Sequence, residues 1–173
     1  MTNFKEDLAR VKAFIFDIDG VLSLQTISLN TFGVPNRTVN LRDGYALQLA
    51  VKKGYFVGVI SGSSSKEYQK RLKLLGVKDI YLNSRSKSDQ FDDFLKKHNL
   101  NSNNVLFMGD DIPDYKVMKQ AGIAVCPADA DNEIKQVASY ISDKKGGEGC
   151  VRDVIEQVLR LHNNWMNSDA FTW

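Results

Sequence analysis

The sequence predicts an α/β protein in which a parallel β-sheet is covered by helices on both faces. Short apolar runs alternate along the chain with amphipathic segments, and several of these segments stop at a glycine. The apolar runs are continuous rather than alternating, which is typical of strands buried on both faces. Alternation of strands and helices favours right-handed crossovers and a parallel sheet. We therefore expect a Rossmann-like arrangement of three layers.

Five apolar runs are predicted to be the strands of this sheet. In chain order they are residues 12–16, 55–60, 79–82, 105–108 and 123–125. Five further segments have the apolar spacing of helices. These segments are residues 45–53, 66–75, 89–98, 113–120 and 151–161. Gly54, Gly76 and Gly122 follow three of them as terminators, and Pro113 opens another at a first-turn position.

One segment interrupts this alternation. Residues 24–41 contain two short extended runs, 26–29 and 38–41, around a Gly33-Val34-Pro35-Asn36 turn. This pattern predicts a β-hairpin inserted between the first strand and the first helix. The intervals between the other elements are too short for a second domain. We therefore expect a single domain that spans residues 1–173, with no cap domain.

Composition excludes several classes of function. The formal net charge is +2, and no stripe of basic and aromatic residues favours nucleic acid. No apolar run approaches the roughly 20 residues that a membrane-spanning helix needs. The charged segment 1–10 lacks the apolar core of a signal peptide, so we expect a cytoplasmic protein. Cys126 and Cys150 lie far apart without metal-type spacing, and we expect free thiols.

The chemistry begins where the first predicted strand ends, at Asp17-Ile18-Asp19-Gly20. Two carboxylates beside a buried strand need a compensating charge, such as a metal ion or a bound phosphoryl group with its cation. In open α/β sheets, ligands bind at the carboxyl ends of the strands. An Asp-x-Asp-Gly sequence also occurs in ordinary turns, so the later strand ends decide its meaning.

Polar groups follow the next two strands in the same way. Ser61-Gly62 offers a hydroxyl and an unobstructed backbone N–H, which suits a phosphoryl oxygen. A serine here is equally suited to cap the following helix. Lys87 lies where a helix is expected to begin, where the helix dipole disfavours a cation. Contact with an anion would explain this lysine, although a solvated surface position stays open.

The fourth strand ends in a cluster of acids, with Asp110, Asp111 and Asp114 in five residues. Asp110 is nearest the strand and is the better candidate for a metal ligand. Asp111 or Asp114 could instead cap the helix that Pro113 opens. Carboxylate ligands without a neighbouring histidine or thiol indicate a hard ion, with Mg²⁺ the expected one.

These motifs, taken in order, resemble those of the haloacid dehalogenase superfamily of aspartate-nucleophile phosphatases. The resemblance covers essentially the whole chain. The sequence Leu41-Arg42-Asp43-Gly44-Tyr45 and the glycine run 146–149 resemble the capless subgroup. That subgroup contains phosphatases of 3-deoxy-D-manno-octulosonate 8-phosphate and of nine-carbon sugar-acid phosphates.

The resemblance implies a role for each motif residue. Asp17 would attack phosphorus and form an aspartyl-phosphate, and Asp19 would serve as general acid and base. Asp17, Asp110 and the backbone carbonyl of Asp19 would hold Mg²⁺. Ser61, Gly62, Lys87 and Arg42 would bind the phosphate and the rest of the substrate, with Asp111 and Asp114 in support.

The resemblance also implies a sugar-phosphate substrate and a homotetramer, in which hairpins and tails of neighbouring subunits cover the open site. The octulosonate 8-phosphate is the expected substrate. A 9-phosphate of a nine-carbon sugar acid (KDN or N-acylneuraminate) is the alternative, because Ser63 and Glu148 stand where the octulosonate enzymes commonly have arginine. A non-catalytic phospho-acceptor or binding module is the alternative of another class. The aromatic tail with Trp165, Phe171 and Trp173 packs on its own chain or on a neighbour.

Overall fold

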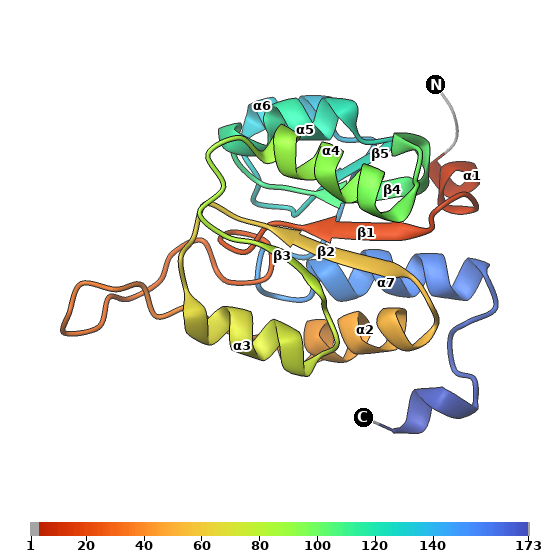
Figure 1. Ribbon diagram of the computed structural model, residues 1–173, viewed down its shortest axis with the longest axis horizontal. Coiled ribbons are helices and arrows are strands. Elements are labelled where there is room, and N and C mark those ends of the chain that lie inside the picture. The colour runs from red at the N-terminus through yellow and green to blue at the C-terminus, as the bar shows by residue number, and fades with distance from the viewer. Residues whose placement is uncertain (1–3, 173) are drawn as a thin grey trace.

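The computed structural model describes residues 4–172, which form a six-stranded parallel sheet with helices on both faces (Figure 1). The strand order is β3-β2-β1-β4-β5-β6. The strands are β1 (Ala13–Phe16), β2 (Phe56–Ile60), β3 (Asp79–Tyr81), β4 (Val105–Met108), β5 (Ile123–Cys126) and β6 (Tyr140–Ile141). This confirms the predicted three-layer α/β fold.

Most of the helices form two layers, one on each face of the sheet. They are α1 (Phe4–Leu8), α2 (Leu41–Lys52), α3 (Lys66–Leu74), α4 (Lys87–His98), α5 (Tyr115–Gln120), α6 (Asn132–Val137) and α7 (Cys150–Leu161). Helices α2, α3 and α7 cover one face of the sheet, and α4, α5 and α6 cover the other (Figure 1). Among residues 4–172 no helix is long and apolar enough to cross a membrane.

Strand β1 shows why its sequence is apolar without interruption. Phe14 and Phe16 point into the core beneath α2 and α7, whereas Ala13 and Ile15 point into the core beneath α4 and α5. All four side chains are fully buried. Because successive side chains of a strand face opposite sides, a strand covered on both faces needs apolar residues at every position.

The strand order fixes where a site can form. Strands β2 and β3 lie on one side of β1, while β4, β5 and β6 lie on the other. The crossover connections therefore diverge at β1 and β4, which are neighbours in the sheet. Such a switch point leaves a crevice at the carboxyl ends of the two strands. Asp17 follows β1 directly, and Asp110 lies two residues beyond β4.

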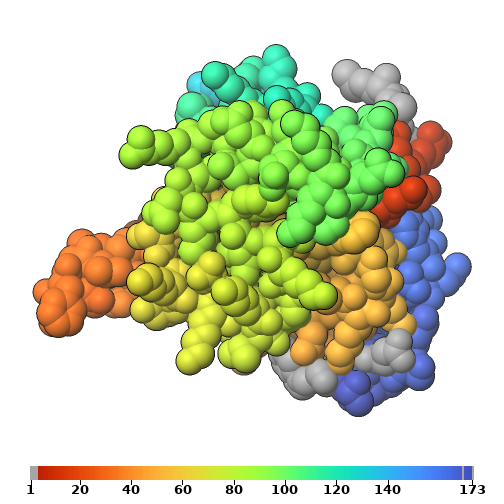
Figure 2. Space-filling model, viewed as in Figure 1, coloured from red at the N-terminus to blue at the C-terminus, as the bar shows by residue number. Residues whose placement is uncertain are grey.

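The inserted segment departs from its prediction. Residues 24–40, called the flap below, contain a single antiparallel bridge between Leu29 and Pro35 and no regular strands. The hydrogen bond from the Asn30 N–H to the Val34 carbonyl closes its turn. The turn therefore spans residues 30–34, whereas residues 33–36 were predicted. The predicted run 38–41 is wrong because Asn40 caps α2, which begins at Leu41. The flap projects from one end of the molecule and is orange in Figures 1 and 2.

Three short elements were not predicted from the sequence. Helices α1 and α6 have five and six residues, and β6 has two. Elements this short do not complete enough of a helical or strand period to be recognised. Both cysteines are free and buried, as expected. Trp165 packs in the core of its own chain, whereas Trp173 lies outside the described residues.

Two leucines of α3 provide a test of the core. Leu72 lies on the buried face of α3 and is 1% exposed, whereas Leu74 of the same helix is 69% exposed. We expect Leu72→Ala to lower the free energy of unfolding by about 2–5 kcal/mol, because it leaves a cavity. Leu74→Ala should change it by less than about 0.5 kcal/mol. Urea denaturation of both variants measures the difference, and equal losses would contradict the described position of α3.

Candidate active site

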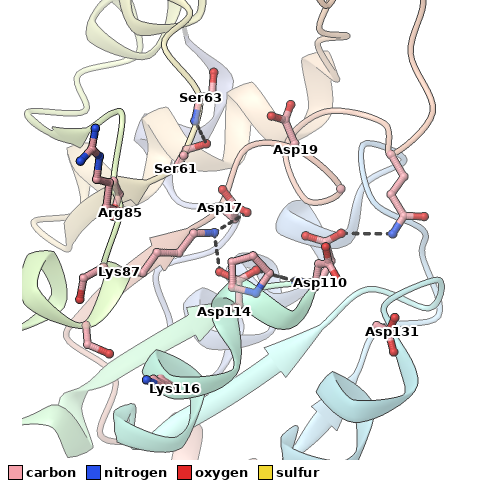
Figure 3. Close-up of a pocket in the computed structure, with 18 of the residues that line it drawn as sticks. Asp17, Asp19, Ser61, Ser63, Arg85, Lys87, Asp110, Asp114, Lys116 and Asp131 are labelled. Carbon is pink, nitrogen blue, oxygen red and sulfur yellow. Dashed lines mark hydrogen bonds and ion pairs between the residues drawn. The ribbon is translucent and has the colours of Figure 1, made fainter.

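Lys87 lies at the centre of a buried group of charges (Figure 3). Its Nζ is 2.6 Å from Asp17 Oδ2 and 2.6 Å from Asp114 Oδ1. All three residues are buried. Lys87 is the first residue of α4, so its position at a helix start is explained by two carboxylates rather than by solvent. Buried lysines and aspartates are tolerated in proteins when they are paired in this way.

Asp110 faces Asp17 across the crevice. Its Oδ2 accepts a hydrogen bond of 3.2 Å from Gln25 of the flap, but its buried Oδ1 has no partner among the described residues. Gly20 makes room for this carboxylate, because a Cβ at that position would lie 1.9 Å from Asp110 Oδ2. An orphaned buried carboxylate oxygen is the expected sign of a ligand that completes the site.

The carboxylates of Asp17, Asp110 and Asp114 come together closely enough to share a cation. One oxygen from each lies within 4.8 Å of the others. All three groups offer hard oxygen ligands, with no thiol or imidazole among them. This donor set fits Mg²⁺ better than zinc or copper. Lys87 contacts both Asp17 and Asp114, whereas Asp110 Oδ1 has no hydrogen-bond partner among the described residues, so Asp110 is the best placed of the three.

The charge balance of the site supports the same conclusion. Burial raises the pKa of Asp17 to about 6, and the neighbouring Asp114 adds to this rise while Lys87 opposes it. Burial also raises the pKa of Asp110 to about 7. For Lys87, burial lowers the pKa, but Asp17 and Asp114 outweigh it and the net shift is upward. One ammonium therefore faces three carboxylates, and a further cation would relieve the excess negative charge.

The acids after β4 have separate structural roles. Asp111 is exposed and caps the short 3₁₀ turn Ile112–Asp114, with the reciprocal contact made by Asp114. Asp114 also accepts a hydrogen bond of 3.1 Å from the Asp110 N–H, which fixes the backbone of the metal candidate. Gly109 is needed here, since a Cβ would overlap the Asp114 carboxylate at 2.4 Å.

Ser61 and Gly62 also line the pocket. Figure 3 shows Ser61 close to Asp17. Ser61 is buried, and its Oγ accepts a hydrogen bond of 3.2 Å from the Ser63 N–H. The helix-capping role that was open for this run of serines falls to Ser65, whose hydroxyl accepts from the Tyr68 N–H. Ser61 is therefore free of the helix-capping role and available to bind a phosphoryl oxygen, which was the other interpretation of this serine.

Asp19 is held by Arg37, a flap residue that was not predicted from the sequence. Arg37 Nε and one of its terminal amino groups lie 2.7 and 2.8 Å from the two oxygens of Asp19. Gln25 is the second flap residue that was missed, through its contact with Asp110. No spacing rule marks either residue, because the flap has no helical or strand periodicity from which its path could be inferred.

Arg42 is not brought to the other predicted site residues. It is exposed in the first turn of α2 and borders a separate depression with Glu148 and Arg152. In the glycine run, the Gly147 N–H donates to the Val21 carbonyl, so this run lies against the loop that follows β1. Arg85 and Lys116 are the further cations that line the site pocket.

The pocket around these residues has a volume of about 980 Å³. A pocket of several hundred Å³ accommodates a small organic molecule. Its lining residues combine cations and carboxylates: Arg85, Lys87, Lys116, Asp17, Asp19, Asp110, Asp111, Asp114, Asp129 and Asp131. The pocket therefore suits a small, polar and charged molecule rather than an apolar one.

Comparison with known proteins agrees with this geometry. The model of the haloacid dehalogenase-like hydrolase family matches residues 75–155. The 3-deoxy-D-manno-octulosonate 8-phosphate phosphatase KdsC of Salmonella typhi is 34% identical over 149 residues, which cover 86% of this chain and 79% of that protein. The protein of the same name from Yersinia pestis is 31% identical over 151 residues, with 87% and 81% covered.

Solved structures give the same result. A 3-deoxy-D-manno-octulosonate 8-phosphate phosphatase from Moraxella catarrhalis, in complex with magnesium ion, phosphate ion and KDO, superposes with a TM-score of 0.89 at 30% identity. The match covers 94% of this chain and 93% of that one. The enzyme from Yersinia pestis gives a TM-score of 0.89 at 29% identity, over 93% and 87% of the two chains. The chain therefore belongs to the haloacid dehalogenase-like hydrolases and groups with their 3-deoxy-D-manno-octulosonate 8-phosphate phosphatases.

Proposed function

We propose that the protein is a Mg²⁺-dependent phosphatase that hydrolyses 3-deoxy-D-manno-octulosonate 8-phosphate through an aspartyl-phosphate. The observation that carries this proposal is the buried Asp17, which is paired with Lys87 and faces Asp110 at the β1–β4 crevice. The relatives of 31–34% identity bear the name of this phosphatase. A related structure holds magnesium, phosphate and KDO together.

Asp17, Asp110 and the backbone carbonyl of Asp19 are the residues that would hold Mg²⁺. The ion, when bound, supplies positive charge that offsets the negative oxygens of the phosphoryl group. Among the described residues, the buried Oδ1 of Asp110 has no hydrogen-bond partner, and the ion would supply one. Lys87 holds Asp17 in place from the opposite side, so the nucleophile keeps one orientation.

The first half of the reaction transfers the phosphoryl group to the protein. A carboxylate oxygen of Asp17 forms a bond to phosphorus while the bond from phosphorus to the sugar oxygen breaks. Asp19 gives its proton to that sugar oxygen as it leaves. Ser61 and the Gly62 N–H bind the phosphoryl oxygens, and Lys87 balances the charge on phosphate and nucleophile.

The second half releases phosphate. Asp19, now a carboxylate, takes a proton from a water molecule whose oxygen bonds to phosphorus. The bond between phosphorus and Asp17 breaks, which regenerates the carboxylate and yields inorganic phosphate. Asp19 ends with the proton that it first donated, so the cycle closes with one water consumed.

A sugar-acid substrate also presents a carboxylate, which a cation near the pocket would recognise. Arg85 and Lys116 line the pocket and are exposed, so they can replace the arginines that are absent at Ser63 and Glu148. Nine-carbon sugar-acid 9-phosphates carry the same two anionic groups and remain the second candidate substrates.

A panel of phosphate esters tests this proposal. We expect Mg²⁺-dependent phosphate release from the octulosonate 8-phosphate, with kcat/KM at least about tenfold above that for KDN and N-acylneuraminate 9-phosphates. A preference for either 9-phosphate would move the assignment to the nine-carbon acids. Absence of turnover together with a stable phosphoprotein would identify a phospho-acceptor domain, and no reaction at all would identify a binding module.

Burial of Asp110 gives a prediction for the metal-free protein. Its pKa of about 7 lies above the ordinary 3.8, so the stabilising effect of protonation is fully present below pH 4 and is lost as the pH rises to about 7. With EDTA at pH 8, Asp110→Asn should raise the free energy of unfolding by about 1–3 kcal/mol. At pH 4 the gain should vanish. In a separate measurement with Mg²⁺ and no EDTA, the variant should lack the stabilisation that the ion gives the wild type.

Asp111→Asn is the matched control, because Asp111 is exposed and an asparagine still caps the 3₁₀ turn. Urea denaturation at both pH values measures these differences. A destabilising effect of Asp110→Asn at pH 8, or Mg²⁺ stabilisation that survives in the variant, would contradict the proposed metal site.

We also propose that the protein works in the cytoplasm as a homotetramer in which flaps cover neighbouring sites. The flap presents Leu29, Phe32 and Val34 with 62%, 89% and 48% of their surfaces exposed. Exposed apolar groups that cluster on a projecting segment favour burial against a partner. No cap domain interrupts residues 4–172, so a second copy of the chain is the available cover.

The oligomeric state can be measured by light scattering after gel filtration. We expect a tetramer for the wild type, and a smaller species with at least about tenfold lower activity for Phe32→Asp. Leu161→Asp, at the exposed end of α7, is the control and should leave both properties unchanged. A fully active wild-type monomer would overturn the proposed lid.

A further inference from the structure

The contact between Arg37 and Asp19 joins the flap to the residue proposed as general acid and base. Both oxygens of Asp19 accept from the Arg37 guanidinium, at 2.7 and 2.8 Å. The Arg37 side chain is only 10% exposed, whereas that of Asp19 is 44% exposed and borders the pocket. Such a two-pronged contact fixes the plane of a carboxylate as well as its position.

The backbone that carries Arg37 is itself anchored beside Asp19. The next residue, Thr38, donates its N–H to Ser23 Oγ at 2.9 Å and accepts from the Leu24 N–H at 2.9 Å. Ser23 in turn forms a bridge with Asp19 and lies in the loop that follows β1. Arg37 is thus presented by the anchored base of the flap and not by its exposed tip.

Asp19 has no other side-chain partner among the described residues. A half-exposed aspartate without a partner would sample several rotamers, and most of them would not direct an oxygen to the scissile bond. Misplacement of a catalytic group by about 1 Å can lower a rate by about 100-fold. A fixed carboxyl plane therefore matters most in the step that transfers a proton to the leaving group.

We propose that Arg37 is a positioning residue that orients the Asp19 carboxyl group toward the leaving oxygen. The guanidinium takes one lone pair of each Asp19 oxygen, and the proton that Asp19 transfers sits on a lone pair that the guanidinium leaves free. The proposal rests on the phosphatase function proposed above and adds a flap residue to it. The sugar alkoxide is a poor leaving group and needs the proton of Asp19 as its bond to phosphorus breaks. The 4-nitrophenolate and acetate anions are stable without a proton, so their esters place little demand on Asp19.

Esters of both kinds therefore separate positioning from a general structural role. For Arg37→Ala we expect kcat/KM to fall by about 10- to 100-fold with the sugar phosphate, and by less than about threefold with 4-nitrophenyl phosphate and acetyl phosphate. The value of kcat/KM covers steps up to departure of the leaving group, so the later attack of water does not enter. Arg37→Lys should restore part of the loss.

Two further variants keep the test decisive. Arg37→Gln preserves a polar side chain of similar length and serves the same comparison if Arg37→Ala does not fold. Asn36→Ala is the flap control, since Asn36 is exposed and, among residues 4–172, its side chain hydrogen-bonds to Ser28 alone. Equal losses with all three esters, or no loss with any, in variants of an active wild type would overturn the role of Arg37. A wild type that hydrolyses none of the esters would instead overturn the phosphatase function, and this inference with it.

Discussion

The ammonium group of Lys87 is the interaction on which the site depends. It contacts Asp17 and Asp114 at 2.6 Å each, in a region where all three side chains are buried. Without this cation, carboxylates from two strand ends would face one another with little solvent to separate them. With it, Asp17 is held in one orientation, while Asp110 keeps an oxygen without a hydrogen-bond partner in the part of the chain that the structure describes. The ion pairs of Lys87 thus allow the buried carboxylates to come together, but negative charge is still in excess. Such an excess is expected of a site that receives a divalent cation together with an anionic ester.

The sheet explains why these residues meet. Because β1 and β4 are neighbours at the switch point, Asp17 and Asp110 lie on the two sides of one crevice. Two glycines then allow the backbones to approach, since side chains at Gly20 and Gly109 would overlap the carboxylates of Asp110 and Asp114. The chemistry of the site is therefore tied to the topology of the fold and to the absence of two Cβ atoms.

Sequence patterns predicted the part of the site that follows from strand ends. Asp17, Ser61, Lys87 and Asp110 could be identified because parallel strands deliver their following residues to one edge. The flap could not be traced in the same way. Arg37 and Gln25 of the flap contact Asp19 and Asp110 because the chain folds back over the crevice, and no sequence periodicity indicates that path.

Two of the regions where the predictions and the structure differ can be explained from local contacts. The segment before α2 was expected to be a strand, but Asn40 supplies a side-chain cap and the helix starts four residues earlier than expected. Arg42 was expected at the substrate, yet the first turn of α2 directs it to another surface of its own chain. Short-range signals indicated the type of each long element, whereas the path of the aperiodic flap depended on contacts between residues far apart in the chain, such as Gln25 with Asp110.

Trapping of the covalent intermediate tests the role of Asp17 most directly. The wild type, mixed with Mg²⁺ and substrate labelled at phosphorus and quenched in acid within milliseconds, should carry label on the peptide that contains Asp17. The label should be released by hydroxylamine, as an acyl phosphate requires, and should be absent from Asp17→Asn. Turnover without any labelled protein, or label on Ser61, would contradict the assignment of Asp17 as the nucleophile.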